Sequence, residues 1–402
     1  MKWNILFLAA ASIVVTACSN EDDPAHTAQP SDKEQPALQV IAELEGEDLL
    51  TRANTAGVLT GTHPWSDQDA IRLFALDYTA FTSQGSVVKY EGADALNKQY
   101  AYKAADRTWE ATDGDPITLS NIFARMYAYS PSFPAAGNDF YNGAAALSPL
   151  ACPIIFNTPN KVDFLYGTHR NTLDGVTDAG GDNMVDEGGS THPNGTSLSY
   201  VDNKNPLLRL YLKHAQTYVR LKVVKNKRDA DKRYPGQGKV TEVEVMQLKA
   251  AVDAYGRDCF LPADGTHGAA LPSKGTINIT TGEITPTAWT VPSMTDLING
   301  TDKTSFILND LPAGGTPTWN EGFCLLAPCE ADMVRGFHLK VDDVDFYIAC
   351  SSAERPVAWK PGFQYTYELV LTGKGLELKP GEDGEVVTIK PWNNGGTTTG
   401  DF

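Results

Sequence analysis

Apolar and polar residues alternate with a period of two along much of the chain, and this pattern predicts β-strands. The clearest run covers residues 363–372. Its apolar face consists of Phe363, Tyr365, Tyr367, Leu369 and Leu371. Such alternation is typical of an antiparallel strand with one buried face. The sequence has no long stretch of helical periodicity, so we expect a mainly-β fold.

Turn residues separate several of these runs. Two alternating segments, 337–341 and 344–348, flank Asp342 and Asp343, and this spacing predicts a hairpin with a two-residue turn. A second turn between strands is expected within residues 277–284, where Gly282 follows a polar stretch. A further strand is indicated where Val243 and Val245 alternate with Glu242 and Glu244.

The alternation changes phase near residue 215. Leucines occupy even positions in residues 208–212, whereas apolar residues occupy odd positions in residues 219–223. Because a one-residue shift sends every later side chain to the other face, residues 214–217 must hold a bulge or separate two strands. We interpret His214 as a packed, hydrogen-bonded residue at this irregularity rather than a ligand.

The first residues have the features of a lipoprotein signal. Lys2 precedes an apolar run at residues 5–17, which is too short for a permanent membrane span and ends in Val-Thr-Ala before Cys18. We therefore expect a signal peptide at residues 1–17 and lipidation of Cys18. The alternative is an ordinary secretory signal with an incidental cysteine. The acidic residues 19–23 indicate either a surface-export signal or a solvated tether.

A strand-like segment follows the tether. Its alternating residues are Leu38, Val40, Ala42 and Leu44. Downstream, Arg52 lies among polar residues, which makes the Arg52–Ala53 bond a candidate site for a trypsin-like protease, with an intact loop as the alternative. We therefore describe residues 18–52 as a lipidated tether and propeptide strand.

The remainder of the chain divides at a polar segment, residues 225–238, that ends in turn residues. We expect one β-sandwich domain at residues 53–226 and a second at 227–402. No repeat of 20–50 residues is evident.

Composition narrows the range of functions. The chain has 402 residues, a formal net charge of −17 at pH 7 and 42% hydrophobic residues. The apolar content excludes a disordered polymer, and the negative charge argues against nucleic acid as a partner. Five cysteines lie beyond Cys18. Cys324 and Cys329 are close enough in sequence for a local disulfide, with buried free thiols as the alternative.

Catalytic and metal-binding motifs are absent from the sequence. It contains no G-x-S-x-G, H-E-x-x-H or G-x-x-x-x-G-K-[ST] motif, and its seven histidines show no ligand spacing. We expect no enzymatic activity, no cofactor and no metal. Six tryptophans beyond the signal peptide could stack on sugars, although core packing is their usual role in a sandwich.

Several segments, in order, resemble a known family. They are Thr51–Ala53, Trp65–Phe74, Val162–Gly167, Leu212–Leu221, Trp359–Leu369 and Ile389–Trp392. Together they resemble fimbrillin-like proteins, the subunits of type V pili, and the resemblance runs from Cys18 to the C-terminus.

The resemblance implies two transthyretin-like β-sandwich domains and export to the outer membrane as a lipoprotein. It also implies that an arginine-specific protease cleaves after Arg52 at the cell surface. Removal of the propeptide strand would uncover a groove that a strand of a neighbouring pilus subunit fills, and the processed protein would reside in the fimbrium. A host or bacterial surface ligand is a further expected partner.

The sequence departs from the family pattern at the C-terminus, which supplies the donor strand in polymerising members. Here Val387 and Ile389 form a candidate donor strand, but Pro391 lacks an N–H group to pair. A tip or anchor subunit is therefore an alternative to a shaft subunit. The rival hypotheses are a non-polymerising surface lipoprotein that binds glycans and a surface hydrolase on a β scaffold.

Overall fold

The computed structural model describes 36–44, 65, 67, 69–77, 90, 97–106, 108–121, 124–131, 148–156, 162–169, 201–203, 206–294, 305–314, 316–330, 334–350, 357–379 and 387–391. The predicted signal peptide, Cys18, Arg52 and Ala53 lie outside the described residues.

All regular elements in these ranges are β-strands, which confirms the mainly-β prediction. None of the described segments forms a helix long and apolar enough to cross a membrane. The strands are β1 (Gln39–Leu44), β2 (Ala70–Asp77), β3 (Lys98–Lys103), β4 (Thr108–Ala111), β5 (Ala124–Ser130), β6 (Cys152–Ile155), β7 (Leu165–His169), β8 (Leu207–His214), β9 (Thr217–Lys225), β10 (Lys239–Val252), β11 (Asp258–Pro262), β12 (Leu271–Ile277), β13 (Ile284–Thr290), β14 (Phe306–Ile307), β15 (Asn320–Leu326), β16 (Arg335–Val341), β17 (Val344–Ala349), β18 (Phe363–Thr372), β19 (Gly375–Leu378) and β20 (Thr388–Pro391).

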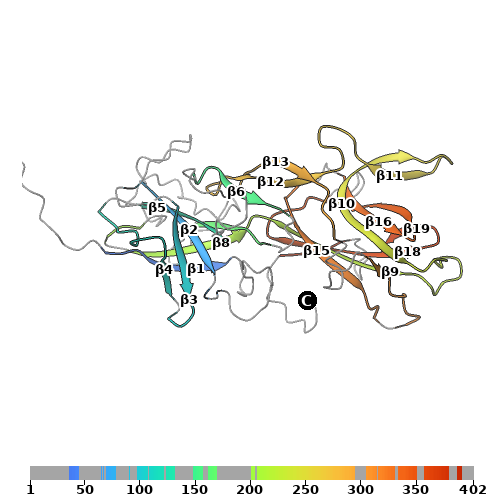
Figure 1. Cartoon of the computed structure of the whole chain (residues 1–402), viewed down its shortest axis with the longest axis horizontal. Coiled ribbons are helices and arrows are strands. Elements are labelled where there is room, and N and C mark those ends of the chain that lie inside the picture. The colour runs from blue at the N-terminus through green and yellow to red at the C-terminus, as the bar shows by residue number, and fades with distance from the viewer. Residues whose placement is uncertain are drawn as a thin grey trace, which may run out of the picture. The chain divides into compact units, whose positions relative to one another are not determined.

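The first sheet has seven strands in the order β1-β8-β7-β5-β2-β3-β4 (Figure 1). Neighbouring strands are antiparallel except for β1 and β8, which are parallel. Alternation along β2 sends Ile71 and Leu73 into one hydrophobic cluster and Phe74 and Leu76 into another. Both faces of the central strands are therefore buried, which explains why β2 contains few polar residues.

A three-stranded sheet, β13-β12-β6, covers one of these faces (Figure 1). Ile277 at the end of β12, together with Ile279, joins Phe74, Tyr129 and Phe164 in the second cluster. The opposite cluster contains Val40 of β1 and Leu38, just before it, and is enclosed by the seven-stranded sheet itself.

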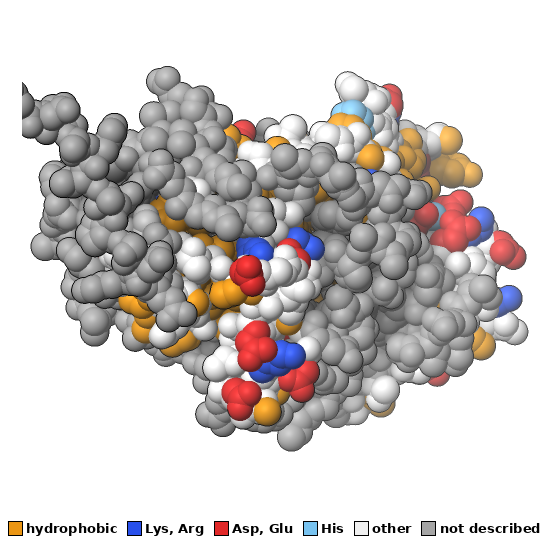
Figure 2. Space-filling model, turned by 60° about the vertical axis from the view of Figure 1, so that its left-hand side comes forward, with side chains coloured by type: hydrophobic (Ala, Val, Ile, Leu, Met, Phe, Trp, Pro, Cys, Tyr) orange, Lys and Arg blue, Asp and Glu red, His pale blue; other side chains and the backbone are white. Residues whose placement is uncertain are grey.

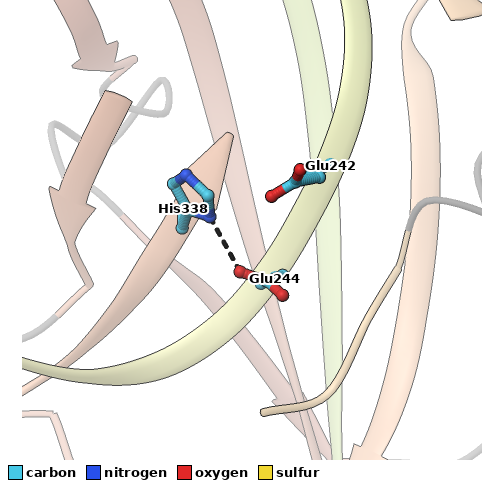
Figure 3. A group of neighbouring side chains, drawn as sticks. All are labelled: Glu242, Glu244 and His338. Atoms are coloured by element: carbon cyan, nitrogen blue, oxygen red, sulfur yellow. Dashed lines mark hydrogen bonds and ion pairs between the residues drawn. The ribbon is translucent and has the colours of Figure 1, made fainter. Parts of the chain in front are cut away.

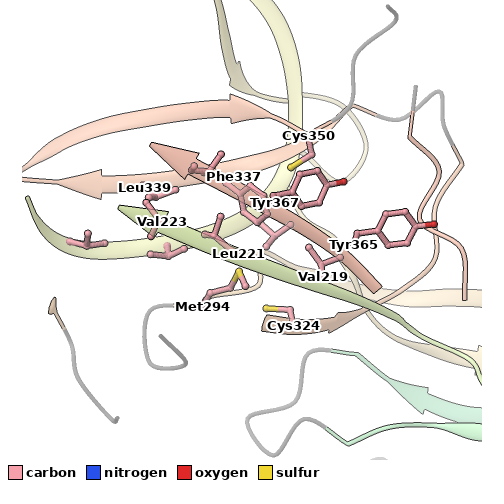
Figure 4. Close-up of a cluster of buried hydrophobic side chains, with 14 of the residues drawn as sticks. Val219, Leu221, Val223, Met294, Cys324, Phe337, Leu339, Cys350, Tyr365 and Tyr367 are labelled. Atoms are coloured by element: carbon pink, nitrogen blue, oxygen red, sulfur yellow. The ribbon is translucent and has the colours of Figure 1, made fainter. Parts of the chain in front are cut away.

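Two further sheets form a sandwich from the rest of the chain. One has the order β11-β10-β16-β17, with β14 paired to β10, and the other has the order β15-β9-β18-β19, with β20 paired to β18. Figure 4 shows their shared core, in which side chains of β9, β16 and β18 interdigitate. The labelled members include Leu221, Phe337 and Tyr367, all fully buried.

The predicted turns are present. β16 and β17 pair directly across Asp342 and Asp343, whose φ angles of 49° and 64° lie in the left-handed region that a two-residue hairpin turn requires. Between β12 and β13, Gly282 has a φ of 82°, and Asn278 donates its N–H to the Glu283 carbonyl at 2.8 Å. Both hairpins confirm the sequence interpretation.

The phase change near residue 215 separates two strands that belong to different sheets, β8 and β9. His214 is buried there and its Nδ1 lies 2.8 Å from the Asp163 carboxylate, as expected for a packed residue. Gln216 accepts the Phe164 N–H at 2.9 Å and donates to the Ile155 carbonyl at 3.1 Å. These bonds fix the two-residue connection between the sheets.

On each side of the expected boundary between residues 226 and 227, strands pair with strands from the other side. β9 precedes it but pairs with β15 and β18, and its Val219, Leu221 and Val223 lie in the sandwich core of the second half. The β12–β13 hairpin follows it but pairs with β6. The two halves thus share strands, and the boundary itself stays a prediction.

Charged side chains of both signs lie beside one another on the face shown in Figure 2, in mixed groups. Among the described residues, cross-strand and local ion pairs include Lys249 with Asp264 at 2.6 Å and Lys232 with Glu377 at 2.8 Å. Exposed pairs of this kind contribute little to stability, because solvent screens them.

Candidate strand-exchange site

The strand predicted from Leu38 to Leu44 lies at the edge of the first sheet. β1 pairs in parallel with β8, from Gln39 opposite Leu207 to Leu44 opposite Leu212. Leu38 and Val40 are buried in the first cluster, with 5% and 6% of their surface exposed, and Ala42 packs against it. Ile41 points the other way and is 40% exposed. The side chain of Leu44 lies outside the described set.

A second segment contacts residues 36–38, just before β1, on the side away from β8. Residues 117–119 run antiparallel to the start of the segment: Leu38 donates its N–H to the Ile117 carbonyl at 2.9 Å, and Leu119 donates to the Pro36 carbonyl at 3.0 Å. Because residues 117–119 follow β4, the two edges of the seven-stranded sheet meet at this point. We refer to β8 and residues 117–119 together as the β1 site.

Two tyrosines hold residues 117–120 in place independently of β1. Tyr100 Oη accepts the Ile117 N–H at 2.9 Å, and Tyr90 Oη accepts the Ser120 N–H at 2.7 Å. Burial raises the pKa of Tyr100 to about 12, against the opposing effect of the Ile117 hydrogen bond. The phenol therefore stays neutral across the physiological range, and this side of the β1 site has its own supports.

The other end of β1 is held by a tryptophan. Trp65 is buried and donates its Nε1–H to the Ala42 carbonyl at 3.0 Å. Its ring meets that of Trp109 edge to face, with centroids 5.0 Å apart. Since Trp65 lies after Arg52 in the sequence, it would remain in the protein after cleavage there, and its environment reports whether β1 is in place.

The hydrogen bonds of β1 alternate in direction. Gln39 donates its N–H to the Pro206 carbonyl at 3.0 Å, so odd-numbered residues face the β8 ladder. The N–H groups of Leu38, Val40 and Ala42 consequently point away from β8. Any strand that replaced β1 would meet the same alternation.

The candidate donor strand forms β20 at an edge of the second sandwich. It is antiparallel to β18, with Ile389 opposite Tyr365 and Pro391 opposite Phe363. Val387, just before it, is 8% exposed and belongs to the core, whereas Ile389 is 49% exposed. The flanking Thr388 and Lys390 are also exposed, so few side chains secure this strand.

The tryptophans considered for sugar stacking are mostly covered. Trp65, Trp109 and Trp359 are buried at 7% exposure or less. His267 stacks on Trp289 with ring centroids 3.5 Å apart, and the Lys379 ammonium lies 5.2 Å from the centre of the Trp319 ring. The sixth, Trp392, lies outside the described ranges. Trp65, Trp109 and Trp359 are therefore packing residues, while Trp289 and Trp319 are half-buried beside His267 and Lys379.

The cysteines beyond Cys18 are free thiols, so the predicted alternative of a local disulfide is not formed between Cys324 and Cys329. Cys324 and Cys350 are fully buried, and burial raises the pKa of the Cys350 thiol well above its ordinary value.

No protein-family model matches the sequence, and no curated protein matches it. Several solved structures are similar. A candidate cell adhesion protein from Bacteroides uniformis is 13% identical with a TM-score of 0.45, over 89% of this chain and 99% of that chain. A second, from Bacteroides ovatus, is 13% identical with a TM-score of 0.46, over 89% and 98%. A fimbrial protein from Bacteroides vulgatus is 13% identical with a TM-score of 0.41, over 80% and 93%. With TM-scores below 0.5, these similarities assign no function to the chain.

Sequence reasoning located β1 but missed its surroundings. Nothing in the local pattern around Tyr90, Tyr100 and Trp65 marked them as supports of a strand so far away in sequence. Their separations from the groups that they bind, between 17 and 30 residues, exceed the range of periodicity arguments.

Proposed function

We propose that this chain is the precursor of a structural and adhesive subunit of a surface fimbria, anchored first through lipid on Cys18 and assembled by strand exchange. Cleavage after Arg52 separates residues 18–52 from the body, and β1 then leaves the β1 site. A strand from another subunit, a second copy or a different one, takes its place.

The observation that carries this proposal is the burial of Leu38 and Val40, from a segment that a single cut detaches. Burying these two side chains contributes roughly 3–6 kcal/mol. Loss of β1 would expose the β8 ladder and part of the first cluster, and an incoming strand with the same alternation would cover both.

The register answers the difficulty raised by Pro391. If residues 387–391 of another copy lay parallel to β8 in place of residues 38–42, Val387 and Ile389 would occupy the positions of Leu38 and Val40. Pro391 would then stand where Ala42 stands, and the N–H at this position points away from β8. A proline there removes no bond from the ladder and keeps a carbonyl for the Trp65 indole. The exposed edge position of β20 leaves it available for such a transfer.

Trypsin treatment of the purified precursor tests the proposal, with Arg52→Ala as the matched control. We expect a stable body that begins at Ala53 and forms ladders of SDS-resistant oligomers, whereas Arg52→Ala yields neither. Tryptophan emission should shift to longer wavelength when β1 leaves and Trp65 becomes exposed, and should recover when a donor strand enters.

Other outcomes separate the alternatives. A body beginning at Ala53 that stays monomeric while its emission shifts would favour a tip or anchor subunit that requires a different donor. A body whose emission does not change, with residues 36–44 still bound after denaturant-free purification and no oligomers, would contradict strand exchange. Binding to a glycan array would then favour a lipid-anchored glycan-binding protein.

A further inference from the structure

The solvent side of the second sandwich carries a group of charged residues on β10, β16 and β17. Register places Glu244 opposite His338, and Lys340 between Glu242 and Asp345. Because residues two apart on a strand share a face, all five side chains project from the same side of the sheet. No metal-ligand spacing is visible in the local sequence, because His338 and the two glutamates come from segments almost a hundred positions apart.

The imidazole of His338 lies at the centre of this group. Its Nδ1 is 2.8 Å from Glu244 Oε2, and its Nε2 is 3.0 Å from Asp345 Oδ1. The ring is 5% exposed and stacks on Tyr347 with centroids 4.7 Å apart, so its orientation is fixed. Figure 3 shows Glu242 and Glu244 side by side on β10, with the His338 ring beside their carboxylates.

Three ligand atoms of this group are already close together. One atom each from Glu242, Glu244 and His338 lie within 4.8 Å of one another. Bonds of about 2.1 Å from nitrogen or oxygen to a zinc ion place neighbouring ligands about 3.0–3.4 Å apart. The 2.8 Å between Nδ1 and Oε2 is close to that spacing, so small side-chain adjustments would complete the geometry.

Asp345 supplies an observation independent of the glutamates. Histidines that bind a metal through one ring nitrogen generally donate the other N–H to a carboxylate, which fixes the tautomer and the ring orientation. Asp345 stands in that relation to Nε2 and leaves Nδ1 directed at Glu244. The imidazole thus lies between two carboxylates, one at each ring nitrogen.

Charge also favours a cation. Lys340 is the nearby positive side chain, 3.4 Å from Glu242, against the carboxylates of Glu242, Glu244 and Asp345. These three carboxylates outnumber the Lys340 ammonium, so the group carries an excess of negative charge.

We propose that Glu242, Glu244 and His338 Nδ1 bind a divalent transition-metal ion such as Zn²⁺, with Asp345 positioning the imidazole. The ion would lie between His338 Nδ1 and Glu244 Oε2, and water would complete its coordination. A nitrogen ligand among carboxylates favours Zn²⁺ or Co²⁺ over Ca²⁺ and Mg²⁺, which prefer oxygen alone. The site would join β10 to β16, and it is independent of the strand-exchange proposal.

Zn²⁺ titration of the full chain by calorimetry tests this site, with His338→Gln and Glu244→Gln as variants and Asp264→Asn as the control. We expect each variant to weaken binding at least about tenfold, and Asp264→Asn, which alters an exposed ion pair elsewhere, to bind like the unaltered protein. The absorption spectrum of Co²⁺ bound at this site should change in His338→Gln and Glu244→Gln but not in Asp264→Asn. Asp345→Asn should weaken binding while preserving the stoichiometry.

Lys340→Met gives the opposite prediction. Removing the ammonium that competes for Glu242 should tighten Zn²⁺ binding about tenfold. If His338→Gln fails to fold, Glu242→Gln replaces a partly exposed carboxylate and keeps the test available. Equal Zn²⁺ affinity in the unaltered protein and in all ligand variants, with no response to Lys340→Met, would overturn the proposal.

Discussion

The two terminal strands of the described chain are held in different ways. β1 is parallel to β8 and buries Val40, and the residues just before it, 36–38, bury Leu38 and are contacted by residues 117–119. β20 is antiparallel to β18, and its described side chains are exposed. One strand is enclosed and the other lies on the surface of its sandwich.

This difference indicates distinct roles for the two ends. An enclosed strand leaves only when something reduces its hold, and a cut at Arg52 would convert β1 from a covalently attached segment into a dissociable peptide. A strand with few buried side chains can be released at low cost in free energy. On the strand-exchange proposal, β1 would be the strand that is replaced and β20 the strand that is donated.

The largest expected effect comes from shortening Leu38, the buried residue just before β1. Leu38→Ala should lower the free energy of unfolding by about 2–5 kcal/mol, because it removes contacts in the first cluster. Ile41→Ala, on the exposed side of β1, should change it by about 0.5 kcal/mol or less. Urea unfolding followed by tryptophan emission measures both. Equal losses would show that β1 does not contribute to the core as described.

Next in size is Tyr100→Phe, which removes the acceptor of a buried N–H and should cost about 1–3 kcal/mol. Because the pKa of Tyr100 is raised to about 12, its neutral form stabilises the fold fully below pH 10, and this contribution is lost as the pH rises towards 12. Between about pH 8 and 12, the free energy of unfolding should therefore fall less steeply with pH for Tyr100→Phe than for the unaltered protein, as measured from unfolding curves at each pH. Identical slopes would remove Tyr100 as a support of the β1 site.

The smallest effects are expected at β20. Val387→Ala should cost about 1.6 kcal/mol for two buried methyl groups, and Ile389→Ala about 0.5 kcal/mol. Thermal unfolding of these two variants and of Leu38→Ala measures the stability lost at each strand, so the losses can be compared directly. A loss at Ile389 that matched Leu38→Ala would contradict the view of β20 as a weakly held strand.

Local pattern was sufficient for strands and turns but not for their partners. The alternation of residues 363–372 matched β18, and the Asp342–Asp343 turn joined β16 to β17, because period and turn chemistry are short-range properties. The phase change near residue 215 marked two separate strands because it follows from side-chain parity alone.

Long-range pairing lay beyond the sequence. The parallel sense of β1 and β8, the packing of the β12–β13 hairpin on the first sheet and the meeting of His338 with Glu244 all join segments far apart in the chain. Register between such segments depends on the complete core rather than on any local run of residues. The candidate site was therefore found as a strand, while its supports and the histidine–carboxylate group emerged only from the fold.

The short connection between β8 and β9 has a mechanical consequence. β8 carries β1, and β9 lies beside β18, the partner of β20, with only Ala215 and Gln216 between them. In a filament joined by strand exchange, tension would enter at one sheet and reach the other along this covalent segment. The donor would be pulled along the direction of β8, so the hydrogen bonds of that ladder would share the load in shear rather than open one after another. Such a joint would resist flow at a cell surface better than a hinge between separate domains.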